Sequence, residues 1–258
     1  MLEHVPWFQK TIPVPPAIHE KFIKLVKQKV AVGTYKPSMS SYHSQILAFR
    51  KPDSENVWIV HNLIPLNEVT IRDSTQPPII DHYAEQCSGR SVYTTLDLFV
   101  GFDHHTLAEE SRDLTSFDTP LGTFRLTVLP QGWTRSLQIF HNDVAFILQD
   151  ETEIAPNFSD DISVLGPKTQ YEMEGGGYEV LEENPGIRRF IWEHLNNVHR
   201  VLHCLTHAGA TVSAKKLFLC LPEVKIVGQL STYEGHVPHK STVSKIQTWL
   251  PCESVSEV

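Results

Sequence analysis

Three aspartates are the residues whose types and spacing could carry chemistry. Asp97 lies near the end of the segment SVYTTLDL, and Asp160 and Asp161 are adjacent in NFSDDISVLGP. Carboxylate oxygens are the ligands that Mg²⁺ prefers, and two divalent ions about 3.5–4 Å apart promote phosphoryl and nucleotidyl transfer. An aspartate pair at a turn is also ordinary turn chemistry. The three residues by themselves leave both interpretations open.

Two strands are expected to position these carboxylates. SVYTTLDL alternates like a half-buried strand that ends near Asp97. The run ISVL favours a second strand, and aspartate tolerates turn geometry, so the sequence predicts a tight hairpin with Asp160 and Asp161 at its bend. The carboxylates can converge on a metal if these two strands are neighbours in one sheet.

Helices are predicted between the strands. Apolar residues recur with helical spacing in segments 18–30 and 139–148. A third helix is predicted to begin at Asn184 and Pro185, an N-cap and first-turn pair, and to continue to Gly209. Its predicted inward face consists of Ile191, Leu195, Val198, Leu202 and Leu205.

Three histidines of this third helix, His199, His203 and His207, recur four residues apart. Residues with this spacing share a helical face and could bind a metal. Leucine and valine already fill the predicted inward face, so the histidines are expected on the solvated side.

The order of the elements predicts an α+β fold, with helices packed on one face of an antiparallel sheet, because strands and helices do not alternate regularly. QILAFRK and VWIVHN, separated by the turn-forming PDSEN, predict a hairpin that carries basic residues. The acidic, glycine-rich tract TQYEMEGGGYEVLEENPG is expected to be a surface excursion.

Composition limits the class of protein. The 258 residues carry a net charge of -8, which argues against coating nucleic acid through bulk positive charge, so any nucleic-acid site must be a local groove. The 4 cysteines include no CxxC pair, which favours a reducing compartment and argues against structural zinc. No apolar run approaches the ~18 residues that span a bilayer. We therefore expect a soluble intracellular protein, cytoplasmic or nuclear, with no membrane partner.

Several strings occur in an order that is typical of one family. They are KPSMSSYHS, LIPLNEVTIRDS, LDLFVGFD, TPLGTFRLTVLPQGW, FSDD and HAGATVSAKKLFLCLPEVKIVGQ. From EHVPW to its last residue, the chain resembles the reverse transcriptase domain of an LTR retrotransposon Pol polyprotein, of the gypsy type found in fungi. The individual strings are modest signals, but their shared order is highly specific.

The resemblance implies a polymerase fold with fingers and palm, an antiparallel palm sheet backed by helices, and a thumb that is truncated or absent. Residues 1–40 would be an N-terminal extension and a helix leading into the fingers. Residues 41–258 would form fingers and palm, with a Gly/Glu-rich surface insertion around 168–184 and a truncated C-terminus.

The resemblance also implies roles for individual residues. Asp97 matches the first metal-binding aspartate, and Asp160 and Asp161 match the family's aspartate pair, which together would be the catalytic triad. Phe102 matches the aromatic residue that packs under the incoming sugar and excludes a 2′-hydroxyl; an ordinary core aromatic is the alternative. Gln131 in LPQGW matches a glutamine that contacts the incoming nucleotide, with a surface turn residue as the alternative.

Two further residues, Arg50 and Lys51, lie on the predicted basic hairpin, where the family places cations against the triphosphate. The implied activity is RNA-directed DNA polymerisation onto a primer 3′-hydroxyl, with two Mg²⁺ ions or Mn²⁺ as the alternative ion. The implied partners are an RNA or DNA template with its primer, deoxynucleotides, and other Pol domains or subunits.

Departures from the family pattern leave a second interpretation open. Trp58 stands where most relatives carry a phosphate-binding arginine, and Ser159 replaces an apolar residue of the aspartate motif. The chain could therefore be a catalytically degenerate retrotransposon relic that binds RNA or primer–template without synthesis. A third interpretation, a metal-dependent nuclease, leaves Phe102 and LPQGW without a role.

Overall fold

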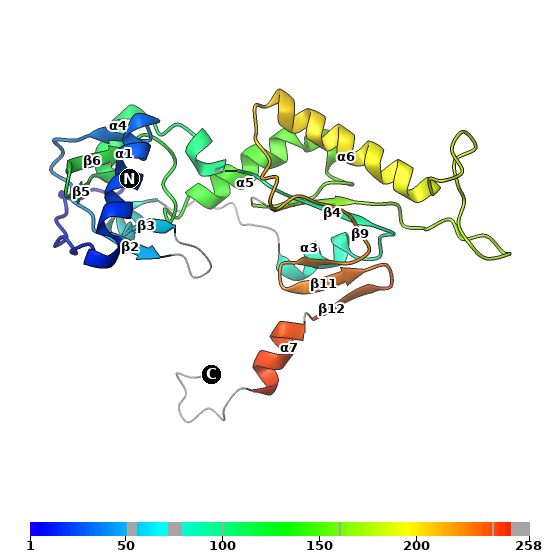
Figure 1. Ribbon diagram of the computed structural model, residues 1–258. Helices are drawn as coiled ribbons and strands as arrows, with labels where there is room; N and C mark the ends of the chain where they lie inside the picture. The colour runs from blue at the N-terminus through cyan, green and yellow to red at the C-terminus, as the bar shows by residue number, and fades with distance from the viewer. Residues whose placement is uncertain (51–55, 72–78, 100, 160, 239, 249–258) are drawn as a thin grey trace. The chain divides into compact units, whose positions relative to one another are not determined.

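The computed structural model describes residues 1–50, 56–71, 79–99, 101–159, 161–238 and 240–248 (Figure 1). The chain divides into two compact units, each formed by two stretches of sequence. Unit 1 comprises Met1–Gln76 and Val100–Asp143, and unit 2 comprises Pro77–Phe99 and Val144–Val258. Helix α5 (Ser136–Ile147) runs across this division.

Unit 1 has two small antiparallel sheets and one longer helix. Its elements are η1 (Pro16–Ile18), α1 (His19–Ala31), β1 (Tyr35–Pro37), β2 (Ile46–Arg50), β3 (Val57–His61), α2 (Ile64–Val69), η2 (Gly101–His104), α4 (Glu109–Arg112), η3 (Asp113–Thr115), β5 (Phe117–Thr119) and β6 (Gly122–Leu126). One sheet has the order β1-β6-β5, and β2 pairs with β3. The core consists of Phe22, Val26, Tyr35, Ile46, Phe117, Phe124 and Leu126.

The basic hairpin predicted from QILAFRK and VWIVHN is confirmed. Strands β2 and β3 pair from Ile46↔His61 to Arg50↔Val57, and the turn between them, including Lys51, lies outside the described residues. Helix α1 buries Phe22 and Val26 in the unit 1 core, as its helical spacing predicts.

Unit 2 contains the strands on which the aspartates lie. Its elements are α3 (Ile80–Cys87), β4 (Tyr93–Asp97), η4 (Gln149–Glu151), β7 (Asn157–Phe158), β8 (Asp161–Leu165), α6 (Arg189–His207), β9 (Phe218–Leu221), β10 (Val224–Ile226), β11 (Gln229–Thr232), β12 (Gly235–Pro238) and α7 (Lys240–Gln247). One antiparallel sheet has the order β7-β8-β4-β9, and the other has the order β10-β11-β12.

The two faces of the four-stranded sheet have different coverings (Figure 1). On one face, α6 packs over β8 and β4, and its His194 forms a hydrogen bond with Thr94. On the other face, Tyr83 and Cys87 of α3 form a core cluster with Tyr93, Leu165, Val224 and Ile226. Successive residues of a strand point to opposite faces, so Tyr93, Thr95 and Asp97 share the second face.

The predicted start of the third helix at Asn184 and Pro185 is wrong, because α6 begins at Arg189 and its N-cap residue is Arg188. The predicted inward face is also partly wrong. The buried residues of α6 are Phe190, His194, Val198, Val201 and Leu205. Leu195 instead has 39% of its surface exposed. The helix is therefore rotated relative to the prediction, with a histidine at the centre of its inward face.

The acidic, glycine-rich excursion is fastened to the start of α6 by Arg189. The Arg189 guanidinium contacts Glu179 at 2.7 Å and Glu193 at 2.9 Å, and it lies over the ring of Tyr171 at 4.1 Å. The excursion is therefore a surface segment, as predicted, but one with a defined attachment. None of the helices in the described part of the chain combines the length and apolar character needed to cross a bilayer.

Candidate active site

The register of the central strands brings two of the predicted carboxylates together. β4 and β8 pair antiparallel with Asp97 directly opposite Asp161. Directly opposed residues of such a pair have Cβ atoms about 4.5–5.5 Å apart and point to the same face. The condition for convergence, that the two strands are neighbours in one sheet, is therefore met for Asp97 and Asp161. Asp160 lies outside the described residues.

A tight hairpin connects β7 to β8 and sets the position of Asp161. Phe158 pairs with Asp161, so only Ser159 and Asp160 separate the two strands. Ser159 has a φ of 60°, the left-handed geometry that two-residue hairpin turns require and that few residues other than glycine adopt readily. Among the described residues, the buried Ser159 hydroxyl has no hydrogen-bond partner.

Asp97 has a cationic partner that the sequence interpretation missed. Nζ of Lys216 lies 2.6 Å from Oδ2 of Asp97. The Asp97 side chain is only 16% exposed, whereas that of Lys216 is 64% exposed. The string SAKK belongs to the family resemblance, but no periodicity or local spacing connects Lys216 to an aspartate so far away in the sequence.

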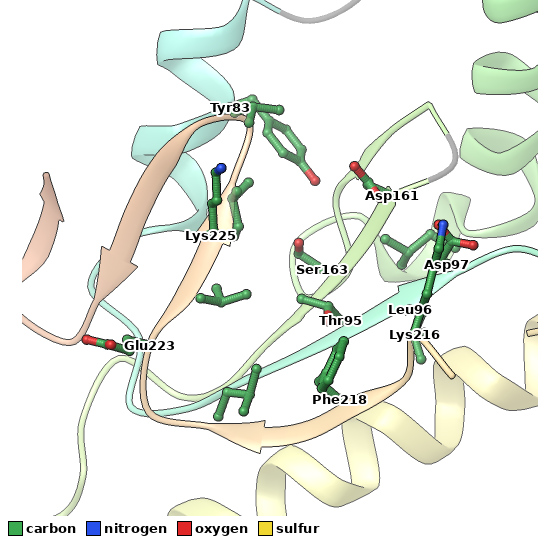
Figure 2. Close-up of a pocket in the computed structure, with 15 residues that line it drawn as sticks. Tyr83, Thr95, Leu96, Asp97, Asp161, Ser163, Lys216, Phe218, Glu223 and Lys225 are labelled. Carbon is green, nitrogen blue, oxygen red and sulfur yellow. The ribbon is translucent and has the colours of Figure 1, made fainter. Parts of the chain in front are cut away.

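A cavity of about 450 Å³ adjoins these carboxylates in unit 2 (Figure 2). Its lining includes Asp97, Asp161, Tyr83, Ser163, Phe218 and Lys225. Figure 2 shows Asp97 and Lys216 together at one side of the cavity, and the Tyr83 hydroxyl pointing toward the side where Asp161 lies. Burial raises the pKa of Tyr83 well above its usual range, and the Tyr83 hydroxyl donates to the Pro156 carbonyl at 3.1 Å. Tyr83 therefore remains a neutral donor.

The carboxylate pair suits a hard divalent cation. Asp97 and Asp161 present oxygen ligands on one face of the sheet, and oxygen ligands of this kind hold Mg²⁺. Within the described residues, no group of three or more metal-ligating side chains converges, and Asp160 is not among those residues.

The three histidines of α6 that are spaced four residues apart, His199, His203 and His207, are exposed, as expected.

The other predicted site residues belong to unit 1. Phe102 lies in η2 and stacks on Phe140, with ring centroids 4.8 Å apart and planes inclined by 22°. Gln131 and Trp58 line a unit 1 cavity of about 910 Å³, and 52% of the Trp58 surface is exposed. Arg50 is exposed at the last pair of the basic hairpin.

Comparison with known proteins places this geometry in a family. Residues 25–231 match the family model described as "Reverse transcriptase (RNA-dependent DNA polymerase)". The chain is 24% identical over 263 residues to the retrovirus-related Pol polyprotein from transposon gypsy of Drosophila melanogaster, covering 100% of this chain and 23% of that protein. It is 25% identical to the enzymatic polyprotein of figwort mosaic virus (strain DxS), covering 92% of this chain and 33% of that protein.

Solved structures show the same fold. The foamy viral protease-reverse transcriptase in complex with dsDNA superposes with a TM-score of 0.79 at 22% identity, covering 99% of this chain and 48% of that one. The same protein in complex with an RNA/DNA hybrid gives a TM-score of 0.76 at 22% identity, covering 98% and 31%. This chain thus spans less than half the length of each of these proteins.

The predicted α+β polymerase fold with an antiparallel sheet backed by helices is confirmed by these superpositions and by the pairing of the strands. The family match covers both aspartate-bearing strands and most of the chain. The chain belongs to the reverse transcriptase (RNA-dependent DNA polymerase) family.

Proposed function

We propose that the chain is the polymerase portion of an RNA-directed DNA polymerase of an LTR retrotransposon Pol polyprotein. The primer 3′-hydroxyl attacks the α-phosphate of a deoxynucleotide, and pyrophosphate leaves. The observation that carries this proposal is the β4–β8 register, which sets Asp97 opposite Asp161 in a chain of the reverse transcriptase family.

Asp97 and Asp161, joined by Asp160 from the hairpin turn, are the proposed ligands of two Mg²⁺ ions, with Mn²⁺ as the alternative ion. When bound, such a pair of ions activates the attacking hydroxyl and stabilises the leaving oxygen. The contribution of the protein is to fix carboxylates on one sheet face, where their orientation is set before the substrate arrives.

Unit 1 supplies the proposed nucleotide-binding residues. Phe102 stacks on Phe140, and this contact restrains the orientation of the Phe102 ring. A restrained ring packed under the sugar supports selection against a 2′-hydroxyl. Gln131 lines the unit 1 cavity and is the proposed contact to the incoming nucleotide. Arg50 and Lys51 are the proposed partners of the triphosphate, since their charges neutralise phosphate.

The foamy viral relatives bind dsDNA and an RNA/DNA hybrid, which supports an RNA or DNA template with primer as the partner of this chain. Deoxynucleotides and other Pol domains or subunits complete the proposed set of partners.

In the proposed organisation, residues 1–40 lead into the fingers, and 41–258 form fingers and palm with a surface insertion around 168–184. The described cysteines are free, which fits an intracellular compartment, cytoplasmic or nuclear.

One observation favours a second function, a relic that binds primer–template without synthesis. The aspartate hairpin buries the Ser159 hydroxyl, which has no hydrogen-bond partner within the described residues. A buried hydroxyl without a partner destabilises its surroundings by roughly 1–3 kcal/mol. This hairpin is the segment that must hold two of the three carboxylates still.

The test is extension of a primer annealed to an RNA template, with deoxynucleotides and Mg²⁺, by the wild type and by the Asp97→Asn and Asp161→Asn variants. Each substitution keeps the side-chain size and removes the charge that binds metal. We expect extension to fall by about a thousandfold or more in each variant, because the loss of metal stabilisation is worth several kcal/mol.

Asp81→Asn is the matched control, because Asp81 is an exposed aspartate of α3 in the same unit. It should extend like the wild type. If the Asp97→Asn variant extends primers as the wild type does, the assignment of Asp97 as a catalytic metal ligand is wrong. A wild type that binds primer–template but never extends it would establish the relic function instead.

A further inference from the structure

Lys216 reaches Asp97 from a loop that is bound to the aspartate's own strand. The Ser213 amide donates to the Asp97 carbonyl at 2.9 Å, and the Phe99 amide donates to the Thr211 carbonyl at 2.7 Å. The Lys216 amide then donates to the Ser213 carbonyl at 3.0 Å, which closes a turn. These backbone bonds fix where the Lys216 side chain starts, so its contact with Asp97 follows from the fold of the loop.

The contact offsets an electrostatic problem in the carboxylate pair. Asp97 and Asp161 are directly opposed in the β4–β8 ladder, and like charges in that relation are destabilising. With no divalent ion bound, the Lys216 ammonium, 2.6 Å from Oδ2 of Asp97, is a positive charge that reduces this repulsion. The folded protein without metal is therefore stabilised by Lys216.

A divalent ion that binds Asp97 would compete with Lys216 for the same carboxylate. Two cations that share one ligand repel each other, so binding of the ion favours departure of the ammonium. The Lys216 side chain is 64% exposed, so its ammonium remains largely hydrated within the contact, and a pair with such an exposed partner contributes on the order of 1 kcal/mol. The ammonium can therefore move into water at low cost.

We propose that Lys216 is an internal counter-cation that exchanges with the metal at Asp97. It is a positioning residue: it holds the carboxylate in the metal-free protein and lowers the affinity for the ion that replaces it. This inference rests on the proposed function, because that function assigns Asp97 to a metal. The coupling is reciprocal, so the contact with Lys216 weakens metal binding by the same factor by which metal weakens the contact.

The test measures Mn²⁺ binding directly, from the electron paramagnetic resonance signal of the free ion, with no template or nucleotide present. Lys216→Met keeps the length of the side chain and removes its charge. We expect the Mn²⁺ dissociation constant to fall by about fivefold, the factor that corresponds to an exposed ion pair. Lys216→Arg, which keeps the charge, should remain close to the wild type.

Lys215→Met is the matched control, because Lys215 is the exposed neighbour in the same loop and carries the same charge. It should leave the dissociation constant unchanged. Equal tightening by Lys215→Met and Lys216→Met would overturn the proposal, since the effect would then be that of general surface charge. Unchanged or weaker Mn²⁺ binding by Lys216→Met would also overturn it.

Thermal unfolding gives an independent readout on the same proteins. In EDTA, Lys216→Met should unfold at a lower temperature than the wild type, and saturating Mn²⁺ should raise its unfolding temperature by more. An equal Mn²⁺-induced rise in both proteins would contradict the exchange. If Lys216→Met does not fold, Lys216→Gln replaces it in both measurements.

The outcome is separable from that of primer extension. If the wild type extends primers but Mn²⁺ binding does not depend on Lys216, the counter-cation proposal is wrong and the polymerase proposal stands. If Lys216→Met binds Mn²⁺ more tightly but the wild type never extends a primer, the polymerase proposal is wrong and the counter-cation proposal stands.

Discussion

Oγ1 of Thr94 and Nε2 of His194 lie 2.7 Å apart in the interior of unit 2. The hydrogen bond joins a fully buried histidine of α6 to the strand that carries Asp97. Thr94 also accepts from the Cys220 amide at 3.2 Å, so a single threonine links β4 to a helix and to β9. Burial lowers the pKa of His194 to about 4.

This lowered pKa predicts that the protein loses stability in mild acid. The folded state keeps His194 neutral, whereas the unfolded chain binds a proton near pH 6.5, so the contribution is complete above pH 6.5 and is lost as the pH falls toward 4. The free energy of unfolding, measured with urea, should fall between pH 7 and pH 5 in the wild type. This decrease should be about 1–2 kcal/mol larger than the decrease in His194→Gln. An identical pH dependence in the two proteins would contradict the assignment. His61 of unit 1 is half-buried, and desolvation lowers its pKa to about 4 as well, so it contributes to the pH dependence of both the wild type and His194→Gln.

Gly101 is predicted to be irreplaceable beside the Phe102–Phe140 stack. A Cβ at position 101 would lie 2.6 Å from Cε2 of Phe140 and closer still to Cζ, and the Phe140 ring is buried. Gly101→Ala should lower the free energy of unfolding by about 1–3 kcal/mol, as overpacking of a core does. Gly175→Ala, where a Cβ meets nothing within 4 Å, should cost far less in the same denaturation experiment.

Ser159→Gly should stabilise the aspartate hairpin. The substitution relieves the cost of a φ of 60° in a residue with a side chain, and it removes the buried hydroxyl. We expect the free energy of unfolding to rise by about 1 kcal/mol. Ser159→Ala, which removes only the hydroxyl, separates the two causes. A decrease in stability for both variants would mean that the hydroxyl has a favourable role.

Trp58→Arg should lower the KM for deoxynucleotides if the chain is a polymerase. Trp58 lies on the unit 1 cavity that Gln131 also lines, and a guanidinium there could bind phosphate oxygens in a bidentate manner. The expected decrease in KM is about tenfold or more in steady-state extension assays, the scale of one charge-assisted hydrogen bond. Trp58→Phe is the control for lost aromatic bulk, and an equal change in that variant would exclude the guanidinium as the cause.

The sequence predicted the parts of the fold that local patterns encode. The alternation in SVYTTLDL and the strand-favouring run ISVL predicted two strands, and the pairing of β4 with β8 meets the condition under which their carboxylates converge. The hairpin of β2 and β3 was predicted because a turn-forming run separates two strand-like runs. The polymerase fold itself was predicted from the order of the motifs.

Long-range contacts explain what the sequence did not predict. The Asn184–Pro185 pair is a sound helix start on local grounds, but in the structure Asn184 closes a turn by accepting from the Ile187 amide, and α6 begins at Arg189. His194 faces inward because Thr94 offers it a hydrogen bond, and no helical periodicity can encode that partner. Lys216 contacts Asp97 because its loop is hydrogen-bonded to the end of β4, which is distant in the sequence, and local sequence patterns cannot predict such a contact.

The order of the strands makes the two carboxylates unequal in mobility. β4 is an inner strand. At Asp97 it pairs with β8 on one side, and on the other side the Asp97 carbonyl accepts from the Ser213 amide, so the backbone of Asp97 is restrained from both sides. Asp161 is the first residue of β8, and its outer neighbour β7 is only two residues long. Backbone amides near Asp97 should therefore exchange with deuterium more slowly than those of the aspartate hairpin. In the proposed metal site, Asp97 is therefore the firmly held ligand, and Asp161 is the ligand with more freedom to adjust to ions of different radius.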